Sequence, residues 1–105
     1  MIRKFQNTDI NEIAKIWLDT NIKAHNFILA QYWQEKFKIA KDMFLQAEIY
    51  VYENEGTNKV RGFIGLSNDY IAGIFICSEA QSYGIGKQLL DFVKESKIEL
   101  SLNVY

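Results

Sequence analysis

The clearest structural signal in this chain is the stretch Gln81-Ser82-Tyr83-Gly84-Ile85-Gly86-Lys87-Gln88-Leu89-Leu90. It follows an apolar run at residues 71–77 and precedes an amphipathic helical pattern, so it predicts a strand, a glycine turn and a helix. Glycine permits positive φ angles and lets a ligand approach the main chain. The first N–H groups of a helix have no partner within it, and the helix dipole favours an anion there. We therefore expect a phosphate-bearing ligand where the helix begins, near Gly84.

Two common nucleotide motifs are excluded. The sequence has no G-x-x-x-x-G-K-[ST], which excludes a P-loop. The dinucleotide fingerprint needs a third spaced glycine in the first strand–helix unit, and this chain has none there. An isolated G-x-G pair is weak evidence, because many helices begin near glycine for structural reasons alone. The surrounding elements must therefore decide which ligand the turn binds.

Length and composition are typical of one soluble globular domain spanning residues 1–105. The chain is 49% hydrophobic and 24% charged, and its net charge of −1 gives no general attraction for nucleic acid or an anionic membrane. Its single cysteine, Cys77, excludes an intrachain disulfide and is expected to be a small buried side chain; we expect no metal site. No apolar run approaches membrane-spanning length and no secretory leader is recognisable, so we expect a cytoplasmic protein.

The N-terminal half predicts a strand and two helices. Residues 2–5 favour a short strand, and Asp9 with Glu12 forms a start signal close to a capping box. Two helical patterns follow, with apolar residues at spacings of three and four: Ile10, Ile13 and Trp17, then Trp33, Phe37, Ala40 and Phe44. We expect Trp33 and Phe37 to be core residues rather than a substrate platform, and the lysines at 36–41 to face water.

The second half predicts strands around the final helix. Residues 47–52 and 60–66 read as a hairpin whose loop is at 53–59, with Tyr50 and Tyr52 covering the sheet. The run at 71–77 is almost wholly apolar, as in a central strand covered on both faces. Residues 98–105 alternate as a last strand. The order is β-α-α-β-β-β-α-β, and the final crossover requires two parallel strands.

With these elements in place, the segment Gln81-Ser82-Tyr83-Gly84-Ile85-Gly86 resembles the [Arg/Gln]-x-x-Gly-x-[Gly/Ala] motif of GNAT-type N-acetyltransferases. The element order matches as well, and Thr8-Asp9-Ile10 and Phe75-Ile76 agree with it. The chain is similar to the small bacterial single-domain type. The resemblance implies the GNAT fold, an α+β architecture with a mixed, mostly antiparallel sheet.

The resemblance also implies a cofactor site for acetyl-CoA as co-substrate. In the family, main-chain N–H groups of the motif hold the pyrophosphate, a role that falls here on Gln81, Ser82, Tyr83, Gly84, Ile85 and Gly86, with Lys87 adjacent. The pantetheine arm pairs with the preceding strand, which implicates Phe75 and Ile76, and the diverging neighbour is the run at 98–104.

The implied reaction is acetyl transfer to a primary amine of a small molecule or protein. A general base makes the amine neutral, main-chain N–H groups stabilise the oxyanion, and a general acid protonates the leaving thiolate. His25 is a candidate near the acceptor pocket, with an ordinary hydrogen-bonded histidine in a helix connection as the alternative. Catalytic residues are not assigned, because the family's usual tyrosine belongs to a helix after the last strand and Tyr105 is a terminal residue.

The sequence departs from the family pattern at its end. It stops at Asn103-Val104-Tyr105, where the family continues with a helix and two further strands. We expect the chain to be incomplete at the C-terminus, with a natural minimal form as the alternative. Two other readings stay open: a non-catalytic CoA-binding or interaction module, and a homodimer formed through an exposed C-terminal strand.

Overall fold

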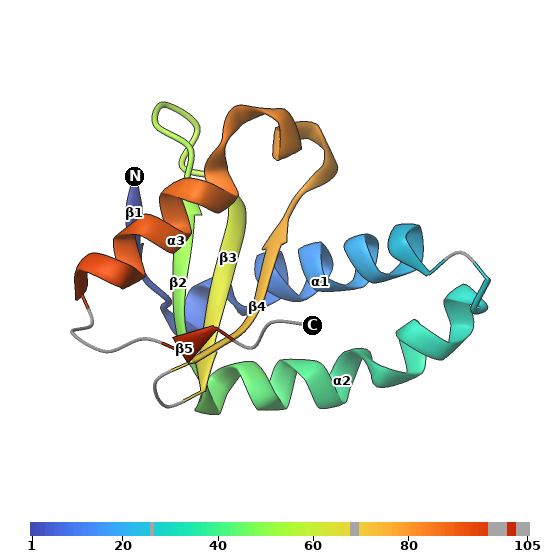
Figure 1. Ribbon diagram of the computed structural model, residues 1–105. Helices are drawn as coiled ribbons and strands as arrows, with labels where there is room; N and C mark the ends of the chain where they lie inside the picture. The colour runs from blue at the N-terminus through green and yellow to red at the C-terminus, as the bar shows by residue number, and fades with distance from the viewer. Residues whose placement is uncertain (26, 68–69, 97–100, 103–105) are drawn as a thin grey trace.

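The computed structural model describes residues 1–25, 27–67, 70–96 and 101–102. It shows an α+β fold in which five strands form one sheet in the order β1-β2-β3-β4-β5 (Figure 1). The elements are β1 (Ile2–Lys4), α1 (Ile10–Ala24), α2 (Ala30–Gln46), β2 (Glu48–Glu53), β3 (Val60–Ser67), β4 (Tyr70–Ile76), α3 (Ile85–Ser96) and β5 (Ser101–Leu102), with 3-10 turns η1 (Asn7–Asp9) and η2 (Ser78–Tyr83). This confirms the predicted order of helices and strands.

The sheet is mixed in the way the crossover required. Strands β1 to β4 are antiparallel to their neighbours, and β5 is parallel to β4, with Tyr70 opposite Ser101 and Ile71 opposite Leu102. The rest of the predicted last strand, including the edge proposed for a homodimer, lies outside the described residues. Helix α3 therefore connects two parallel strands.

Strand alternation creates a separate core on each face of the sheet. Helix α3 covers one face, where the buried side chains are Ile64, Leu66, Ile71, Ala80, Ile85, Leu89 and Val93. Helix α1 covers the other, where they are Ile13, Ile16, Ile49, Val51, Val60 and Phe63. Tyr50 and Tyr52 pack on the α3 face, as predicted, and the ring of Tyr50 lies 5.3 Å from that of Phe92.

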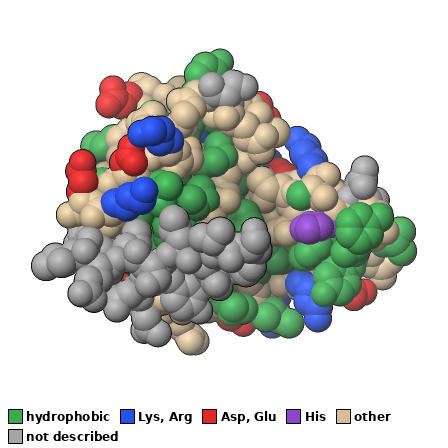
Figure 2. Space-filling view, in the orientation of Figure 1, with side chains coloured by type: hydrophobic (Ala, Val, Ile, Leu, Met, Phe, Trp, Pro, Cys, Tyr) green, Lys and Arg blue, Asp and Glu red, His purple; other side chains and the backbone are tan. Residues whose placement is uncertain are grey.

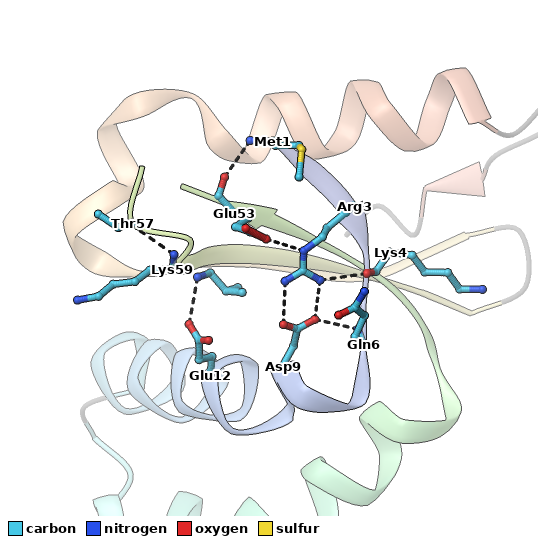
Figure 3. Close-up of polar contacts among 10 residues, drawn as sticks. Met1, Arg3, Lys4, Gln6, Asp9, Glu12, Glu53, Thr57 and Lys59 are labelled. Atoms are coloured by element: carbon cyan, nitrogen blue, oxygen red, sulfur yellow. Dashed lines mark hydrogen bonds and ion pairs between the residues drawn. The ribbon is translucent and has the colours of Figure 1, made fainter. Parts of the chain in front are cut away.

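The start of α1 differs from the predicted capping box. The helix does begin after Asp9, but this residue makes no side-chain cap to it. The carboxylate of Asp9 instead accepts hydrogen bonds from the guanidinium of Arg3 and the Gln6 N–H, while Glu12 accepts one from the Val60 N–H at 3.0 Å (Figure 3). The bond from Gln6 belongs to a capping box at the start of η1, and Arg3 of β1 and Val60 of β3 supply the other donors to these carboxylates.

Strand β4 is less covered than predicted. Ala72 is exposed, the side chain of Ile74 is 37% exposed, and Cys77 is only half-buried. The prediction of a strand covered on both faces is therefore wrong at Ala72 and Ile74. Among the described residues, β5 pairs only with Tyr70 and Ile71.

Helix α2 packs mainly against α1, and its residue Phe44 also contacts Phe63 of the sheet. Ala40 is its one buried residue in the described chain, and Trp33 and Phe37 are half-buried. Trp33 meets Trp17 of α1 edge to face, with ring centroids 5.9 Å apart. The prediction that these aromatic residues serve packing is confirmed for Trp33. Lys36 and Lys38 face solvent as expected, whereas Lys41 is half-buried, with its ammonium over the ring of Phe37.

Candidate active site

The glycine motif forms a turn that leads into the N-terminus of α3. Gly84 has φ 71°, the left-handed conformation that glycine adopts at little cost. The first helical hydrogen bond runs from the Gln88 N–H to the Gly84 carbonyl, at 3.1 Å. The N–H groups of Ile85, Gly86 and Lys87 precede that bond, so the helix does not use them. This arrangement can bind an anion.

An anion at this turn would be bound mainly by main-chain N–H groups, because the nearby cation, Lys87, already has a partner. Lys87 is exposed and forms an ion pair with Asp91 at 2.7 Å, which raises the pKa of Lys87 and lowers that of Asp91. Tyr83 is 73% exposed, and Gln81 donates from Nε2 to the Ile76 carbonyl at 3.2 Å. Gln81 thus links the turn to the end of β4 by a side-chain bond that the sequence did not predict.

Strand β4 presents main-chain groups on its side away from β3. The Cys77 N–H donates to the Arg61 carbonyl at 2.9 Å, which fixes the alternation of the antiparallel ladder. On this alternation the N–H and C=O of Phe75 point toward β3, and those of Ile74 and Ile76 point away from it. Of the two residues expected to pair with a pantetheine arm, Ile76 has outward-directed groups, and Ile74 is the second such residue.

A cleft of about 710 Å³ lies on the other face, between the C-terminal half of α2 and strands β3 and β4. Its wall is a chain of aromatic rings: Phe44 lies 6.5 Å from Trp17 and 5.5 Å from Phe63, which stacks on Phe75 at 5.1 Å. The remaining lining residues are Met43, Gln46, Ala47, Glu48, Ile49, Gly65, Leu66, Ser67, Ala72 and Gly73. The cleft is therefore mainly apolar and suits an alkyl group.

His25 does not line this cleft. It ends α1, stacks on Trp33 at 5.4 Å and meets the exposed ring of Phe27 at 6.0 Å. Figure 2 shows hydrophobic side chains gathered around this histidine. Trp33 in turn contacts Trp17, which does line the cleft, so two indole rings connect His25 with it.

Sequence reasoning missed the cleft. Its residues come from α1, α2, β2, β3 and β4, and no local motif unites them. The available signal was a pair of glycines, Gly65 and Gly73, inside two consecutive strand patterns, where glycine often marks a close approach. Within the described ranges, His, Cys, Asp and Glu side chains form no group of three that could hold a metal ion. No described helix is both long enough and apolar enough to span a bilayer.

Comparison with known proteins identifies the family. Over 107 residues the chain is 33% identical to the peptidyl-lysine N-acetyltransferase YiaC of Escherichia coli K12, and the match covers all of this chain and 72% of that protein. The chain belongs to the GNAT family of N-acetyltransferases. It is an acetyl-CoA-dependent enzyme that transfers an acetyl group to an amine, and the non-catalytic alternative is not favoured.

Two further relatives support this assignment. The chain is 27% identical over 103 residues to the peptidyl-lysine N-acetyltransferase YjaB of Escherichia coli K12, covering 98% of this chain and 69% of that protein. The solution structure of apo YjaB has a TM-score of 0.83 and covers 99% of this chain and 70% of that one, at 26% identity. The PaiA N-acetyltransferase of Thermoplasma acidophilum, solved in complex with coenzyme A, shares the fold with a TM-score of 0.76 at 17% sequence identity. The superposition covers 91% of this chain and 70% of the PaiA chain. No protein-family model matches the chain.

Proposed function

We propose that this enzyme acetylates the side-chain amine of lysine in proteins or peptides, with CoA bound along Gln81–Lys87 and the outer edge of β4. The observation that carries the proposal is the position of β4 between two surfaces. Ala72, Gly73 and Phe75 line the apolar cleft. The side chains of Ile74 and Ile76 lie near the start of α3, each 3.9 Å from where a Cβ on Gly86 would stand.

The residues present fit the cofactor. The N–H groups at the start of α3 that the helix does not use match a pyrophosphate. The outward N–H and C=O of Ile74 and the outward N–H of Ile76 match the amides of a pantetheine arm, while the Ile76 carbonyl accepts from Gln81. Bound there, acetyl-CoA supplies the activated acetyl group as a thioester. A bulge in the β3–β4 register at Ala72 takes one residue out of the ladder, which makes its main-chain N–H a candidate donor to the thioester oxygen.

The cleft suits a lysine side chain. Its aromatic wall can cover the four methylene groups of the stem, and an apolar environment disfavours the charged ammonium. Lowering the amine pKa from its ordinary value of about 10.4 increases the neutral fraction that can attack. The peptidyl-lysine activity in the names of YiaC and YjaB agrees with this acceptor.

The test is an acetylation assay with paired acceptors. The purified chain is incubated with acetyl-CoA and an Nα-blocked peptide containing one lysine, or the same peptide with arginine in its place. We expect CoA release and a singly acetylated product only with the lysine peptide. Acetylation of polyamines or N-terminal amines but of no lysine peptide would overturn the choice of acceptor. Titration with CoA in parallel separates loss of cofactor binding from a wrong acceptor.

Three narrower expectations stay predictions: that residues 1–105 form a single domain, that the protein is cytoplasmic, and that copies pair through the C-terminal strand. The last is addressed by light scattering, where a monomer at high protein concentration would contradict it.

A further inference from the structure

Two glycines lie opposite each other on the floor of the cleft. Gly65 of β3 pairs with Gly73 of β4 in the antiparallel register, and both line the cleft. Alternation along β3 places Gly65 on the same face as Phe63, which is buried beside it. A strand normally presents a side chain at each of these positions, so the pair leaves bare backbone beside the aromatic wall.

Packing explains one of these glycines and not the other. A Cβ on Gly73 would lie 2.7 Å from Cε2 of Phe75, so glycine makes room there for the ring. A Cβ on Gly65 would meet nothing within 4 Å, and Gly65 is not among the glycines with positive φ. Neither backbone conformation nor crowding requires glycine at 65, although glycine inside a strand is destabilising relative to alanine.

The space that a side chain at 65 would fill is cleft space. The residue is accessible although β3 has a neighbouring strand on each side. Phe63 of the same strand and Phe44 of α2 line the cleft together with Gly65, and the centroids of the two rings are 5.5 Å apart. A larger side chain at 65 would therefore narrow the cleft without disturbing the hydrophobic core.

We propose that Gly65 is a specificity-determining residue of the acceptor site, because its missing side chain leaves the space in which the alkyl stem of the acceptor lysine lies. The proposal rests on the proposed function and adds to it the residue that admits a long unbranched amine. Gly65 touches the acceptor rather than the cofactor, since CoA is assigned to the turn at Gly84 and the outer edge of β4.

The experiment compares Gly65→Ala and Gly65→Val with the unchanged protein. We expect the KM for the lysine peptide to rise in the order Gly, Ala, Val, by at least about tenfold for valine, as when a pocket loses room for one or two methylene groups. The KM for acetyl-CoA should stay unchanged. The melting temperature should stay equal or rise, because β-branched residues are favoured in strands.

Ile64→Val is the matched control, since Ile64 is the neighbour of Gly65 but faces the α3 core. It should lower the melting temperature and leave the peptide KM unchanged. A folded Gly65→Val variant with the original peptide KM would overturn the proposal.

A binding readout keeps this outcome separate from the proposed function. Trp17 lines the cleft and Trp33 contacts it, so the tryptophan fluorescence of the protein should change when the lysine peptide binds. At a given peptide concentration the change should be smaller in Gly65→Val. If the unchanged protein binds the peptide without acetylating it, the proposed function fails while Gly65 is still tested. Equal peptide affinity in Gly65→Val would overturn the proposal in that case too.

Discussion

At the scale of single residues, two glycines with left-handed backbone have different roles. Gly84 has φ 71° in the turn before α3, and Gly56 has φ 94° in the loop between β2 and β3. At neither position would a Cβ meet another atom within 4 Å. Both residues are glycine because of backbone conformation, but only Gly84 lies where a pyrophosphate is expected.

This pair gives the first prediction. Gly84→Val and Gly56→Val should each destabilise the protein by about 1–2 kcal/mol, the usual cost of a left-handed L-residue. Gly84→Val alone should weaken CoA binding, because it also displaces the N–H groups at the start of α3. Calorimetric titration with CoA and thermal unfolding check both effects. An equal loss of CoA affinity in the two variants would contradict the proposed cofactor site.

Asp9 is a second residue with an outsized structural role. Asp9 is 4% exposed, and its carboxylate accepts hydrogen bonds from Nη1 and Nη2 of Arg3 at 2.8 and 2.9 Å (Figure 3). The Nε of Arg3 donates to the carboxylate of Glu53 at 2.6 Å. The Arg3 hydrogen bonds hold the pKa of Asp9 below its usual value, helped by the Gln6 N–H and opposed by burial. This cluster ties β1 and β2 to the start of α1.

The second prediction concerns acid stability. Because the folded pKa of Asp9 is depressed, its contribution is present above about pH 4, the ordinary carboxyl pKa, and is lost as pH falls through the folded value. Asp9→Asn should cost roughly 3 kcal/mol at pH 7 and should flatten the acid limb of the stability profile. Urea unfolding at a series of pH values measures both effects.

Asp91→Asn is the control for this prediction. Asp91 also has a lowered pKa from its bond to Lys87, but that ion pair is on the surface. Exposed pairs contribute little, so this variant should unfold like the unchanged protein. If the stability of Asp9→Asn fell at low pH as steeply as that of the unchanged protein, the pH dependence would arise from other groups.

At the scale of elements, α2 differs from the other helices. Helix α3 buries Ile85, Leu89 and Val93 against the sheet, and α1 buries Ile13, Ala14 and Ile16, whereas α2 buries Ala40 alone among its described residues. Several of its large apolar side chains are exposed: Tyr32, Ile39, Met43 and Leu45. Since tertiary packing provides most helix stability in proteins, α2 should be the least stable helix.

The third prediction concerns hydrogen exchange. Amides of α2 should exchange by local opening well before those of α1 and α3, since few buried contacts hold this helix. Native-state exchange followed by mass spectrometry of peptic fragments resolves the three helices. If α2 were protected as strongly as α1, its packing would exceed what the structure shows. Because Met43 and Phe44 form one side of the cleft, opening of α2 would also widen the proposed acceptor site.

At the scale of the whole molecule, the sheet separates two cores that have no buried residue in common. Leu89 belongs to the α3 core and Ile13 to the α1 core, and both are fully buried. Strand β3 contributes to both, with Ile64 facing α3 and Phe63 facing α1. The sheet therefore lies between the two cores, and the half-buried Cys77 packs against both of them.

The fourth prediction is additivity across the sheet. Leu89→Ala and Ile13→Ala should each destabilise the protein by about 2–5 kcal/mol. Because Leu89 and Ile13 belong to buried clusters on opposite faces of the sheet, the free energies should add to within about 0.3–0.5 kcal/mol in the double variant. A variant pair that remains folded, such as Leu89→Val with Ile13→Val, allows the sum to be measured by urea unfolding. A larger coupling would show that one core reorganises when the other is weakened.

The order of elements, the hairpin, the parallel crossover and the glycine turn before α3 can all be predicted from the amino-acid sequence. Each depends on residues close together in the chain: the period of apolar residues sets helix or strand, and glycine at 84 permits the left-handed turn. Together with this order of elements, the motif from Gln81 to Gly86 indicated the family. Local chemistry is enough for these features because their energetics arise within a few residues.

The apolar cleft, the partners of Asp9 and the exposure of Ile74 could not be predicted from the sequence, because each depends on how the elements pack. The cleft needs Trp17, Phe44 and Gly65 to meet, and Asp9 needs the guanidinium that β1 supplies. Ile74 is 37% exposed although the run around it is almost wholly apolar. These outcomes depend on contacts between distant segments, and side-chain burial is a property of that packing rather than of any local pattern.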